Sequence, residues 1–364
     1  MLSVQYKNAG ILKEHHYTRN QCSLFDVSHM GNIKIYGEHR YNFLEKMAVA
    51  DVKELKKGTA TLSCLMNKDG GVVDDTIITN MGDYISMIVN GACKHKDWAF
   101  FQSVLQEEFS DSASSGKLKL DFNTEIGLIA LQGPRAAEVL ENALGKGDSL
   151  NLKKMGFLNA TNHFVKPIGA ECMISRCGYT GEDGFEISVP KDKTMDLADL
   201  FLSQKCGGDE PVTKMAGLGC RDTLRLECGM CLYGHELNES ISPIEAQLTW
   251  LIGKRRKREG GFYGFEKIKR QMAEGVPMRR CGFLTQGMAA REQTEIVDQD
   301  GNPAGKVSSG SYSPTLKKPI GMAYVKVPLN KVGTKLIALN KGKQQPIEIQ
   351  KLPFVETKYY RAPQ

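Results

Sequence analysis

The spacing of apolar residues changes along this chain of 364 residues and divides it into two regions. From residue 1 to about 265, alternating strand patterns such as 84–89 mix with helical patterns such as 94–108. Over residues 275–360, short strands follow one another between glycine, proline and asparagine turns, a pattern typical of a small antiparallel barrel or sandwich. Because regular strand–helix–strand alternation is missing, we predict an α+β fold rather than a doubly wound parallel sheet.

The composition argues against several kinds of partner. Hydrophobic residues make up 41% of the chain, and no apolar run approaches the ~20 residues of a membrane-spanning helix. The formal net charge of +6 is modest for this length; it does not by itself indicate nucleic acid, although it suits an anionic small molecule or an acidic protein. The ten cysteines are scattered and the seven histidines show no metal-ligand spacing. We therefore expect no nucleic acid, no membrane and no metal.

Two adjacent carboxylates, Asp74 and Asp75, stand within an otherwise apolar strand pattern over residues 72–79. Strands are depleted in aspartate, and successive side chains point to opposite faces, so only one of the two can face the interior. The turn signal at 68–71 predicts a hairpin with the preceding run 62–66. We take Asp75 as the interior carboxylate and as a candidate functional acid. Solvated carboxylates on an edge strand, or carboxylates paired with an arginine, would explain the pattern equally well.

A second predicted hairpin, residues 173–179 with 185–189, carries Arg176 and Glu186 on opposite arms. The two side chains could form a cross-strand ion pair with a purely structural role. Alternatively, Glu186 faces a pocket, where its two oxygens could accept paired N–H donors from a planar heterocycle. The hairpin alone leaves both interpretations open. Arg221 follows in the first turn of a predicted helix, where a cation opposes the helix dipole, so we expect it to face an anion or a carboxylate.

Three further motifs have plain structural interpretations. Cys228 and Cys231 form the only C-x-x-C, and without a second pair we expect two structural thiols. The pair His15-His16 lies in a polar segment and is expected to be solvated. The basic run 254–258 is flanked by glycines, which favours a solvated loop, although such charges could also dock an acidic partner or bind phosphate.

Taken together, these segments resemble the aminomethyltransferase family, the T-proteins of the glycine cleavage system, along nearly the whole chain. The basic run together with the paired tyrosines of the tail looks most like the eukaryotic, mitochondrial members. The matching runs are SLFDVSHM (23–30), GGVVDDTIITN (70–80), ALQGP (130–134), RCGYTGEDGFEISVP (176–190), GLGCRDTLRLECGMCLYG (217–234), ISPIEAQLTW (241–250), SSGSYSPTLKK (308–318) and PFVETKYY (353–360).

The resemblance implies a three-lobed, cloverleaf-like α+β body with antiparallel sheets. Two interleaved lobes over residues 1–265 would bind folate, and a C-terminal β-barrel over residues 275–360 would form the third. Tetrahydrofolate would accept a methylene group from the aminomethyl-lipoyl arm of the partner H-protein. The products would be 5,10-methylenetetrahydrofolate, ammonia and dihydrolipoyl H-protein, and the family context implies a mitochondrial location.

The resemblance also implies roles for particular residues. Asp75, the second aspartate of the GG-x-x-DD run, would lie near the folate nitrogens that accept the carbon, where it would handle a proton and stabilise developing positive charge. Glu186 would be a pterin ligand, and Arg221 would help to orient the substrate. Four further positions match the lining of the folate pocket: Tyr359, Tyr179, Asn90 and Met30.

Several expectations remain open within this superfamily. A folate-dependent demethylase and a non-catalytic folate-binding homologue are the alternatives to an aminomethyltransferase. Iron–sulfur assembly factors of the superfamily carry a K-G-C-Y-x-G-Q-type motif, whereas this chain reads MCLYGHE over residues 230–236. Family members usually begin with a further segment, preceded in mitochondrial forms by a transit peptide, so we expect either that the start codon is misassigned or that this form is truncated at its N-terminus.

Overall fold

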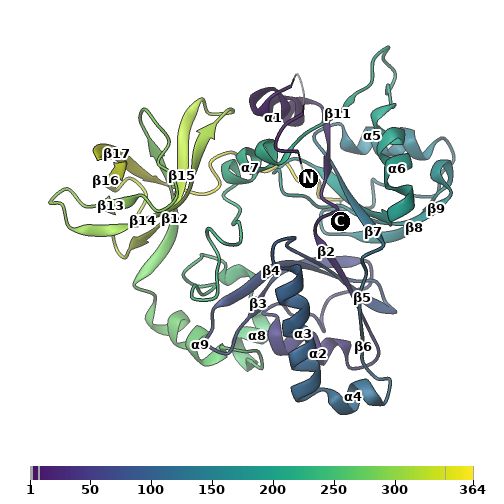
Figure 1. Cartoon of the computed structure of the whole chain (residues 1–364), viewed down its shortest axis with the longest axis horizontal. Helices are drawn as coiled ribbons and strands as arrows, with labels where there is room; N and C mark the ends of the chain where they lie inside the picture. Colours follow the sequence, from purple (N-terminus) through teal and green to yellow (C-terminus); the bar gives the residue numbers. More distant parts are fainter. Residues whose placement is uncertain (1–2, 7–8, 341, 364) are drawn as a thin grey trace.

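The computed structural model describes residues 3–6, 9–340 and 342–363, and its strands form three sheets in three lobes around a common centre. Figure 1 shows a closed barrel on one side and two lobes of mixed helix and strand on the other. The predicted three-lobed α+β architecture with a C-terminal barrel is therefore confirmed. Among the described residues, no helix is long and apolar enough to cross a membrane.

The first sheet has five antiparallel strands in the order β3-β4-β5-β2-β6. Their bounds are β2 Gly31–Tyr36, β3 Thr59–Met66, β4 Val72–Asn80, β5 Tyr84–Val89 and β6 Lys119–Phe122. Side chains of α3 pack into the same core as the strands, for example Phe101 against the cluster that holds Ile33 and Met87. Three helices accompany the sheet: α2 Arg40–Met47, α3 Lys94–Glu108 and α4 Ser110–Ser114. The predicted hairpin forms between β3 and β4, and its turn uses the positive φ of Gly70.

The second sheet has six strands in the order β11-β1-β7-β10-β9-β8. Their bounds are β1 Cys22–Asp26, β7 Ile126–Gln132, β8 Ala160–Val165, β9 Ala170–Ser175, β10 Gly184–Pro190 and β11 Thr213–Met215. Four helices belong to this lobe or border it: α1 Ile11–Asn20, α5 Ala136–Leu144, α6 Thr194–Leu202 and α7 Leu218–Glu227. Short 3₁₀ turns occur at Lys166–Ile168, Lys191–Lys193 and Thr249–Leu251.

This sheet corrects the prediction that all sheets are antiparallel, because β1 and β11 pair in parallel. Parallel neighbours need a long crossover connection, and here the chain between β1 and β11 runs through both lobes before it returns. No local pattern in the sequence signals such a pairing.

The two lobes exchange chain segments. β1 belongs to the six-stranded sheet, the next five strands build the five-stranded sheet, and β7 returns to pair with β1. The core of the five-stranded lobe is completed by residues from much later in the sequence, among them Leu237, Ile244, Phe262 and Ile268.

The third lobe is a closed barrel in the order β12-β15-β14-β13-β16-β17, with Phe283, Val307, Val325 and Ile349 in its core. The strands are β12 Met278–Thr285, β13 Glu295–Val297, β14 Pro303–Ser313, β15 Lys318–Lys326, β16 Lys335–Asn340 and β17 Lys343–Gln350. After β17 the chain runs back as an irregular tail. There the backbone N–H of Lys358 donates to the carbonyl oxygen of Gly181 at 2.7 Å, which places the tail beside the six-stranded sheet.

The basic run is not the solvated loop that its composition favours. It forms the helix α8 Lys254–Glu259, followed by α9 Phe265–Glu274. Arg255 pairs with Glu45 at 2.5 Å and with Asp51 at 2.7 Å, and the buried Arg256 pairs with Glu45 at 3.5 Å. Two of the five cations therefore hold the helix against the five-stranded lobe.

Candidate active site

The two aspartates of β4 occupy opposite faces of the strand, as predicted, but the buried one is Asp74. Asp74 is 0% exposed and shares its face with the fully buried Val72 and Ile78, whereas Asp75 shares its face with the partly exposed Ile77 and is itself partly exposed. The interpretation of Asp75 as the carboxylate that faces the core is therefore wrong. Side chains of successive strand residues point to opposite faces of the sheet, so Asp74 and Asp75 must lie on different faces. Which of the two faces is buried depends on the helices that pack against the sheet.

Asn90, the residue after β5, joins the two carboxylates. Its backbone N–H donates to Oδ2 of Asp74 at 3.0 Å, and its Nδ2 donates to Oδ1 of Asp74 and to Oδ1 of Asp75, both at 2.9 Å. Burial, and next the negative charge of Asp74, raise the pKa of Asp75 to about 7. Asp75 can therefore gain or lose a proton near neutral pH, and Asn90 fixes its orientation.

Glu186 lies on β10 opposite Ser175, and its side chain is only 6% exposed. The predicted cross-strand pair with Arg176 does not form. Arg176 follows the last residue of β9, so its side chain leaves the sheet and binds Asp183 at 2.5 Å and two backbone carbonyl oxygens at 2.7 Å. Glu186 instead faces Arg221, with 3.7 Å between Oε1 and Nη2, and accepts a contact from the thiol of Cys177 at 3.7 Å.

Arg221 is the fourth residue of α7, and it faces a carboxylate, as its position against the helix dipole predicts. Asp222 contacts Arg225 at 2.8 Å. The guanidinium carbon of Arg221 lies 5.0 Å from the ring centre of Tyr179, which is within the range of a cation–π contact. Its Nη1 is buried and has no hydrogen-bond partner within the part of the chain that the structure describes. This N–H group is therefore available to a ligand.

Tyr179 connects the two carboxylate hairpins. The charge of Asp75 acts on its hydroxyl, which donates to the carbonyl oxygen of Cys231, and burial raises the pKa of the phenol. Its ring in turn lies against Arg221, which faces Glu186. The predicted residues therefore form two groups, Asp75 with Asn90 and Tyr179 with Arg221 and Glu186, and the charge of Asp75 acts on Tyr179 of the second group.

The remaining two predicted residues, Tyr359 and Met30, pack against apolar side chains. Tyr359, in the tail, stacks on Phe157 with ring centres 4.1 Å apart and an angle of 14° between the planes. Burial raises the pKa of Tyr359, and the thiol of Cys177 beside Glu186 also acts on it. Met30 packs against a cluster of buried side chains that includes Ile88 and Leu128. Sequence reasoning missed Phe157, since a lone aromatic residue in a loop carries no signal of its partner.

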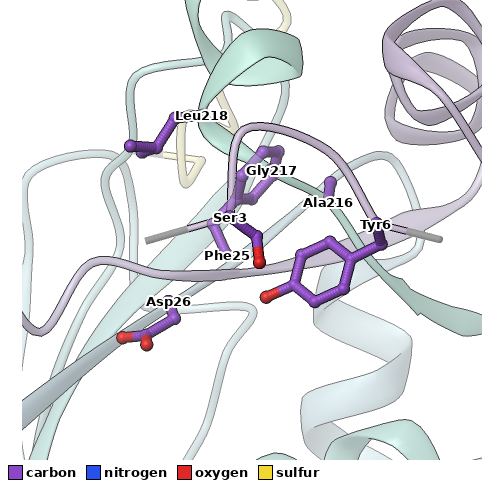
Figure 2. A pocket seen from close by; sticks show the side chains of 7 residues that line it. All are labelled: Ser3, Tyr6, Phe25, Asp26, Ala216, Gly217 and Leu218. Atoms are coloured by element: carbon purple, nitrogen blue, oxygen red, sulfur yellow. The ribbon is translucent and has the colours of Figure 1, made fainter. Parts of the chain in front are cut away.

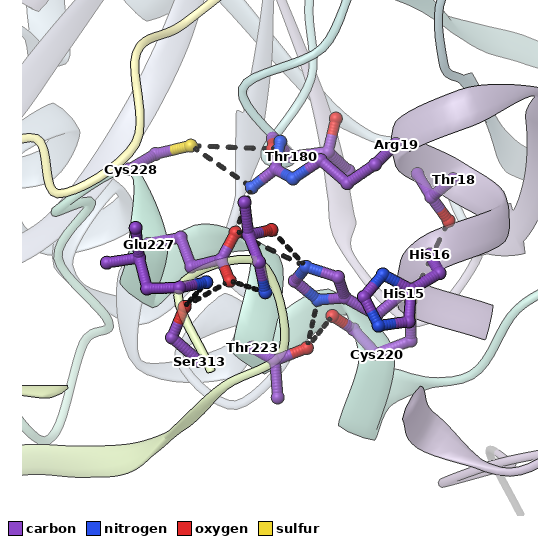
Figure 3. Close-up of polar contacts among 12 residues, drawn as sticks. His15, His16, Thr18, Arg19, Thr180, Cys220, Thr223, Glu227, Cys228 and Ser313 are labelled. Carbon is purple, nitrogen blue, oxygen red and sulfur yellow. Dashed lines mark hydrogen bonds and ion pairs between the residues drawn. The ribbon is translucent and has the colours of Figure 1, made fainter. Parts of the chain in front are cut away.

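A second set of missed residues holds the elements of the site together (Figure 3). Glu227, the last residue of α7, accepts hydrogen bonds from Arg19 of α1 at 2.7 Å, from Ser313 of the barrel at 2.6 Å, and from the backbone N–H and hydroxyl of Thr315 at 3.0 and 2.8 Å. His15 lies 3.2 Å from the same carboxylate and is 0% exposed, so the expectation that it is solvated is wrong. Position 15 falls on the inward side of α1, beside the equally buried Glu14 and Thr18.

Two cavities of the structure lie away from the predicted site residues. One, of about 70 Å³, is lined by Ser3, Tyr6, Asp26 and residues at the start of α7 (Figure 2). The other, of about 260 Å³, lies beside Arg255 and Arg256. Neither cavity is lined by Asp75, Glu186 or Arg221.

The thiols of the C-x-x-C motif are buried at the end of α7. Burial raises the pKa of Cys228 to about 11 and that of Cys231 to about 12, so both are neutral at pH 7. Among the described residues, no group of three or more His, Cys, Asp or Glu side chains could hold a metal ion.

Two family models match the chain: "GCVT N-terminal domain" over residues 1–256 and "Glycine cleavage T-protein C-terminal barrel domain" over residues 279–356. The chain is 43% identical over 360 residues to the mitochondrial aminomethyltransferase of Dictyostelium discoideum, covering 98% of this chain and 88% of that protein. It is 44% identical to the mitochondrial enzyme of Mesembryanthemum crystallinum, covering 100% of this chain and 86% of the relative.

A solved structure agrees with these sequence relatives. The crystal structure of the glycine cleavage system aminomethyltransferase T from Bartonella henselae superposes with a TM-score of 0.87 and 31% identity, covering 99% of this chain and 93% of that one. The chain therefore belongs to the aminomethyltransferase family, the T-proteins of the glycine cleavage system.

Proposed function

We propose that this aminomethyltransferase moves a methylene group from the aminomethyl-lipoyl arm of the H-protein to tetrahydrofolate, releasing ammonia and giving 5,10-methylenetetrahydrofolate. The observation that carries the proposal is the set of polar groups that runs from the partly buried Asp75 past Tyr179 and Arg221 to the buried Glu186. It offers an acid with a pKa near neutrality at one end and an acceptor for a heterocycle at the other.

The groups at the Glu186 end suit a reduced pteridine. The Glu186 carboxylate is held by a loose ion pair of 3.7 Å with Arg221 and by a contact of 3.7 Å from the thiol of Cys177, so its oxygens can still accept N–H donors from a planar ring. The unpartnered Nη1 of Arg221 supplies a donor to an acceptor on the same molecule. The rings of Tyr179 and Tyr359 and the side chain of Met30 would form the walls against which the bound molecule packs.

Asp75 would act at the other end. Forming a carbon–nitrogen bond on folate releases a proton from a ring nitrogen, and a base is most effective when its pKa lies near the working pH. Asp75, with its pKa raised to about 7, meets that requirement, and its negative form would also stabilise positive charge that develops on the transferred carbon. The two hydrogen bonds from the Asn90 amide would hold Asp75 and Asp74 in place during transfer.

The partner, the location and the domain roles belong to the same proposal. The lipoylated H-protein would deliver the carbon, and the net charge of +6 would favour an acidic partner. A mitochondrial location is supported by the names of the relatives, which are mitochondrial aminomethyltransferases. Residues 1–265 would form the folate-binding region and residues 275–360 the barrel that borders it.

The test compares Asp75→Asn and Glu186→Gln with Asp69→Asn, a control in the exposed turn of the same hairpin. We expect Asp75→Asn to lose about 10²–10⁴-fold in methylene transfer from aminomethylated H-protein, because general acid–base catalysis typically contributes that much. Its affinity for tetrahydrofolate, measured by titration, should stay close to wild type. Glu186→Gln should weaken folate binding about tenfold or more, since a charge-assisted hydrogen bond is worth roughly 1.5–3 kcal/mol. Full transfer activity in Asp75→Asn would refute the role given to Asp75, and folate binding without any transfer in the wild type would refute the proposed reaction.

A further inference from the structure

A third carboxyl group lies behind the two aspartates of β4. Asp97 is the fourth residue of α3, and its side chain is 0% exposed. Neither of its oxygens has a hydrogen-bond donor within the described residues. A buried carboxylate without a donor is costly, so the group needs a physical explanation.

The neighbours of Asp97 show what that explanation is. This turn of α3 lies against β4, since the ammonium group of Lys96 donates to the carbonyl oxygen of Val73 at 2.6 Å, and the carboxyl groups of Asp74 and Asp75 both act on the buried Asp97. Asp74 already accepts two hydrogen bonds from Asn90, so it is present as an acceptor. Two ionised carboxyl groups cannot hydrogen-bond to each other, because neither has a proton to donate.

No nearby cation neutralises this cluster in the described structure. Lys96 is the cation that acts on Asp97, but its ammonium group donates to the carbonyl oxygen of Val73 at 2.6 Å, to the hydroxyl of Tyr233 at 2.7 Å and to Glu239 at 3.2 Å. Cys93, just before α3, contributes a neutral thiol because burial and next the charge of Asp74 raise its pKa.

We propose that Asp97 is a positioning residue for methylene transfer: at neutral pH it is protonated and donates a hydrogen bond to Asp74, which keeps Asp74 the acceptor that holds Asn90, and Asn90 in turn holds Asp75. Burial, then the charge of Asp74 and the hydrogen bond to it, raise the pKa of Asp97 well above its usual range, in agreement with this arrangement. The inference rests on the proposed role of Asp75 and adds the residue that sets its surroundings.

A protonated Asp97 limits the number of negative charges beside Asp75. With Asp97 neutral, Asp74 is the negative charge that acts most strongly on Asp75, and the pKa of Asp75 is about 7. A third ionised carboxyl beside them would raise the pKa of Asp75 further, so that Asp75 would hold its proton at neutral pH and fail as a base. The protonation of Asp97 therefore helps to keep Asp75 in its working range.

The first experiment detects the proton directly. Infrared difference spectroscopy of the wild type against Asp97→Asn at pH 8 should show the C=O stretch of a protonated, buried carboxylic acid that the variant lacks. Asp69→Asn, in the exposed turn, should leave that band in place. No such band in the wild type would overturn the proposal, whatever the outcome for Asp75→Asn in catalysis.

The second experiment measures function through the pH profile. In Asp97→Asn the amide keeps the donor and the shape, so we expect kcat within about threefold of wild type and an acidic limb of kcat/KM displaced by less than about 0.3 pH unit. In Asp97→Leu the donor is lost, and kcat should fall about tenfold or more at an unchanged KM for folate. If Asp97 were ionised in the wild type, Asp97→Asn would remove a buried charge and move the limb to lower pH by more than about half a unit, which would overturn the proposal.

Discussion

Replacing Glu227 by glutamine should destabilise the whole molecule, because this carboxylate joins α1, α7 and the barrel. Although burial acts to raise its pKa, hydrogen bonds from His15, Ser313 and Arg19 lower it from 4.5 to about 2. At about 1.4 kcal/mol per pH unit, this depression corresponds to about 3 kcal/mol of folding free energy. Burial lowers the pKa of His15, so its ring is neutral at pH 7 and adds a hydrogen bond but no charge there. Arg19 and the hydroxyl donors must therefore supply most of the effect, and we expect a loss of about 2–3 kcal/mol.

The pH dependence gives this prediction its sign. A carboxylate whose pKa is depressed on folding stabilises the native state above its unfolded pKa of 4.5, and that contribution is lost as the pH falls through about 2. The difference in unfolding free energy between wild type and Glu227→Gln should therefore be constant from pH 5 to pH 7 and shrink below pH 4.5.

Urea unfolding followed by tryptophan fluorescence measures this difference from the midpoint at constant slope. Glu138→Gln is the matched control, since Glu138 pairs with Arg135 at 2.7 Å on a helix but is 43% exposed, and exposed pairs contribute about 0–1 kcal/mol. A loss below about 1 kcal/mol for Glu227→Gln at pH 7, or one no larger than the control, would refute the reasoning.

Three further outcomes follow from the site. Asp75→Asn should unfold at a higher temperature than wild type at pH 8, and the difference should be smaller at pH 5. The folded-state pKa of Asp75 is raised from 3.8 to about 7, so its ionised form increasingly destabilises the native state as the pH rises through this range. Thermal unfolding at the two pH values checks this, and a lower melting temperature of the variant at pH 8 would contradict it. Arg221→Lys and Arg221→Gln should both raise the KM for folate, because an ammonium group cannot reproduce a planar guanidinium that lies near the ring of Tyr179. Steady-state kinetics measures this, and a wild-type KM in the lysine variant would contradict it. Replacing both Cys228 and Cys231 by alanine should leave folate affinity and transfer activity near wild type, since both thiols are neutral at pH 7. A large loss of activity in a folded double variant would show that the thiols take part in the reaction.

Much of the local structure follows from sequence periodicity. The helix predicted at 94–108 and the strand predicted at 84–89 have the observed bounds, because apolar spacing reports short-range packing. The parallel pairing of β1 with β11 could not be predicted, since the two strands lie far apart in the sequence and their contact depends on the whole intervening chain.

The site is harder to predict than the elements that carry it. The alternation of β4 separates Asp74 from Asp75, but which of them is buried depends on helices that pack later. Arg176 lies one residue beyond the end of β9, and this small difference in the strand boundary redirects its side chain from Glu186 to Asp183. The grouping of Glu186 with Asp75 rests on the resemblance to a family, since the sequence of neither hairpin predicts that it lies near the other.

The exchange of segments between the two mixed lobes has a consequence for synthesis on the ribosome. β1 emerges early but has no partner until β7 follows about a hundred residues later, and the five-stranded sheet waits for Ile244 and Ile268 to fill its interior. The six-stranded sheet cannot be completed before β11 at Thr213–Met215 has been made, and the five-stranded lobe lacks part of its core until Ile268 follows, so apolar surface stays uncovered for most of translation. We expect the polypeptide to depend on chaperones during biosynthesis, and expression of either lobe as a separate gene fragment to yield aggregated material.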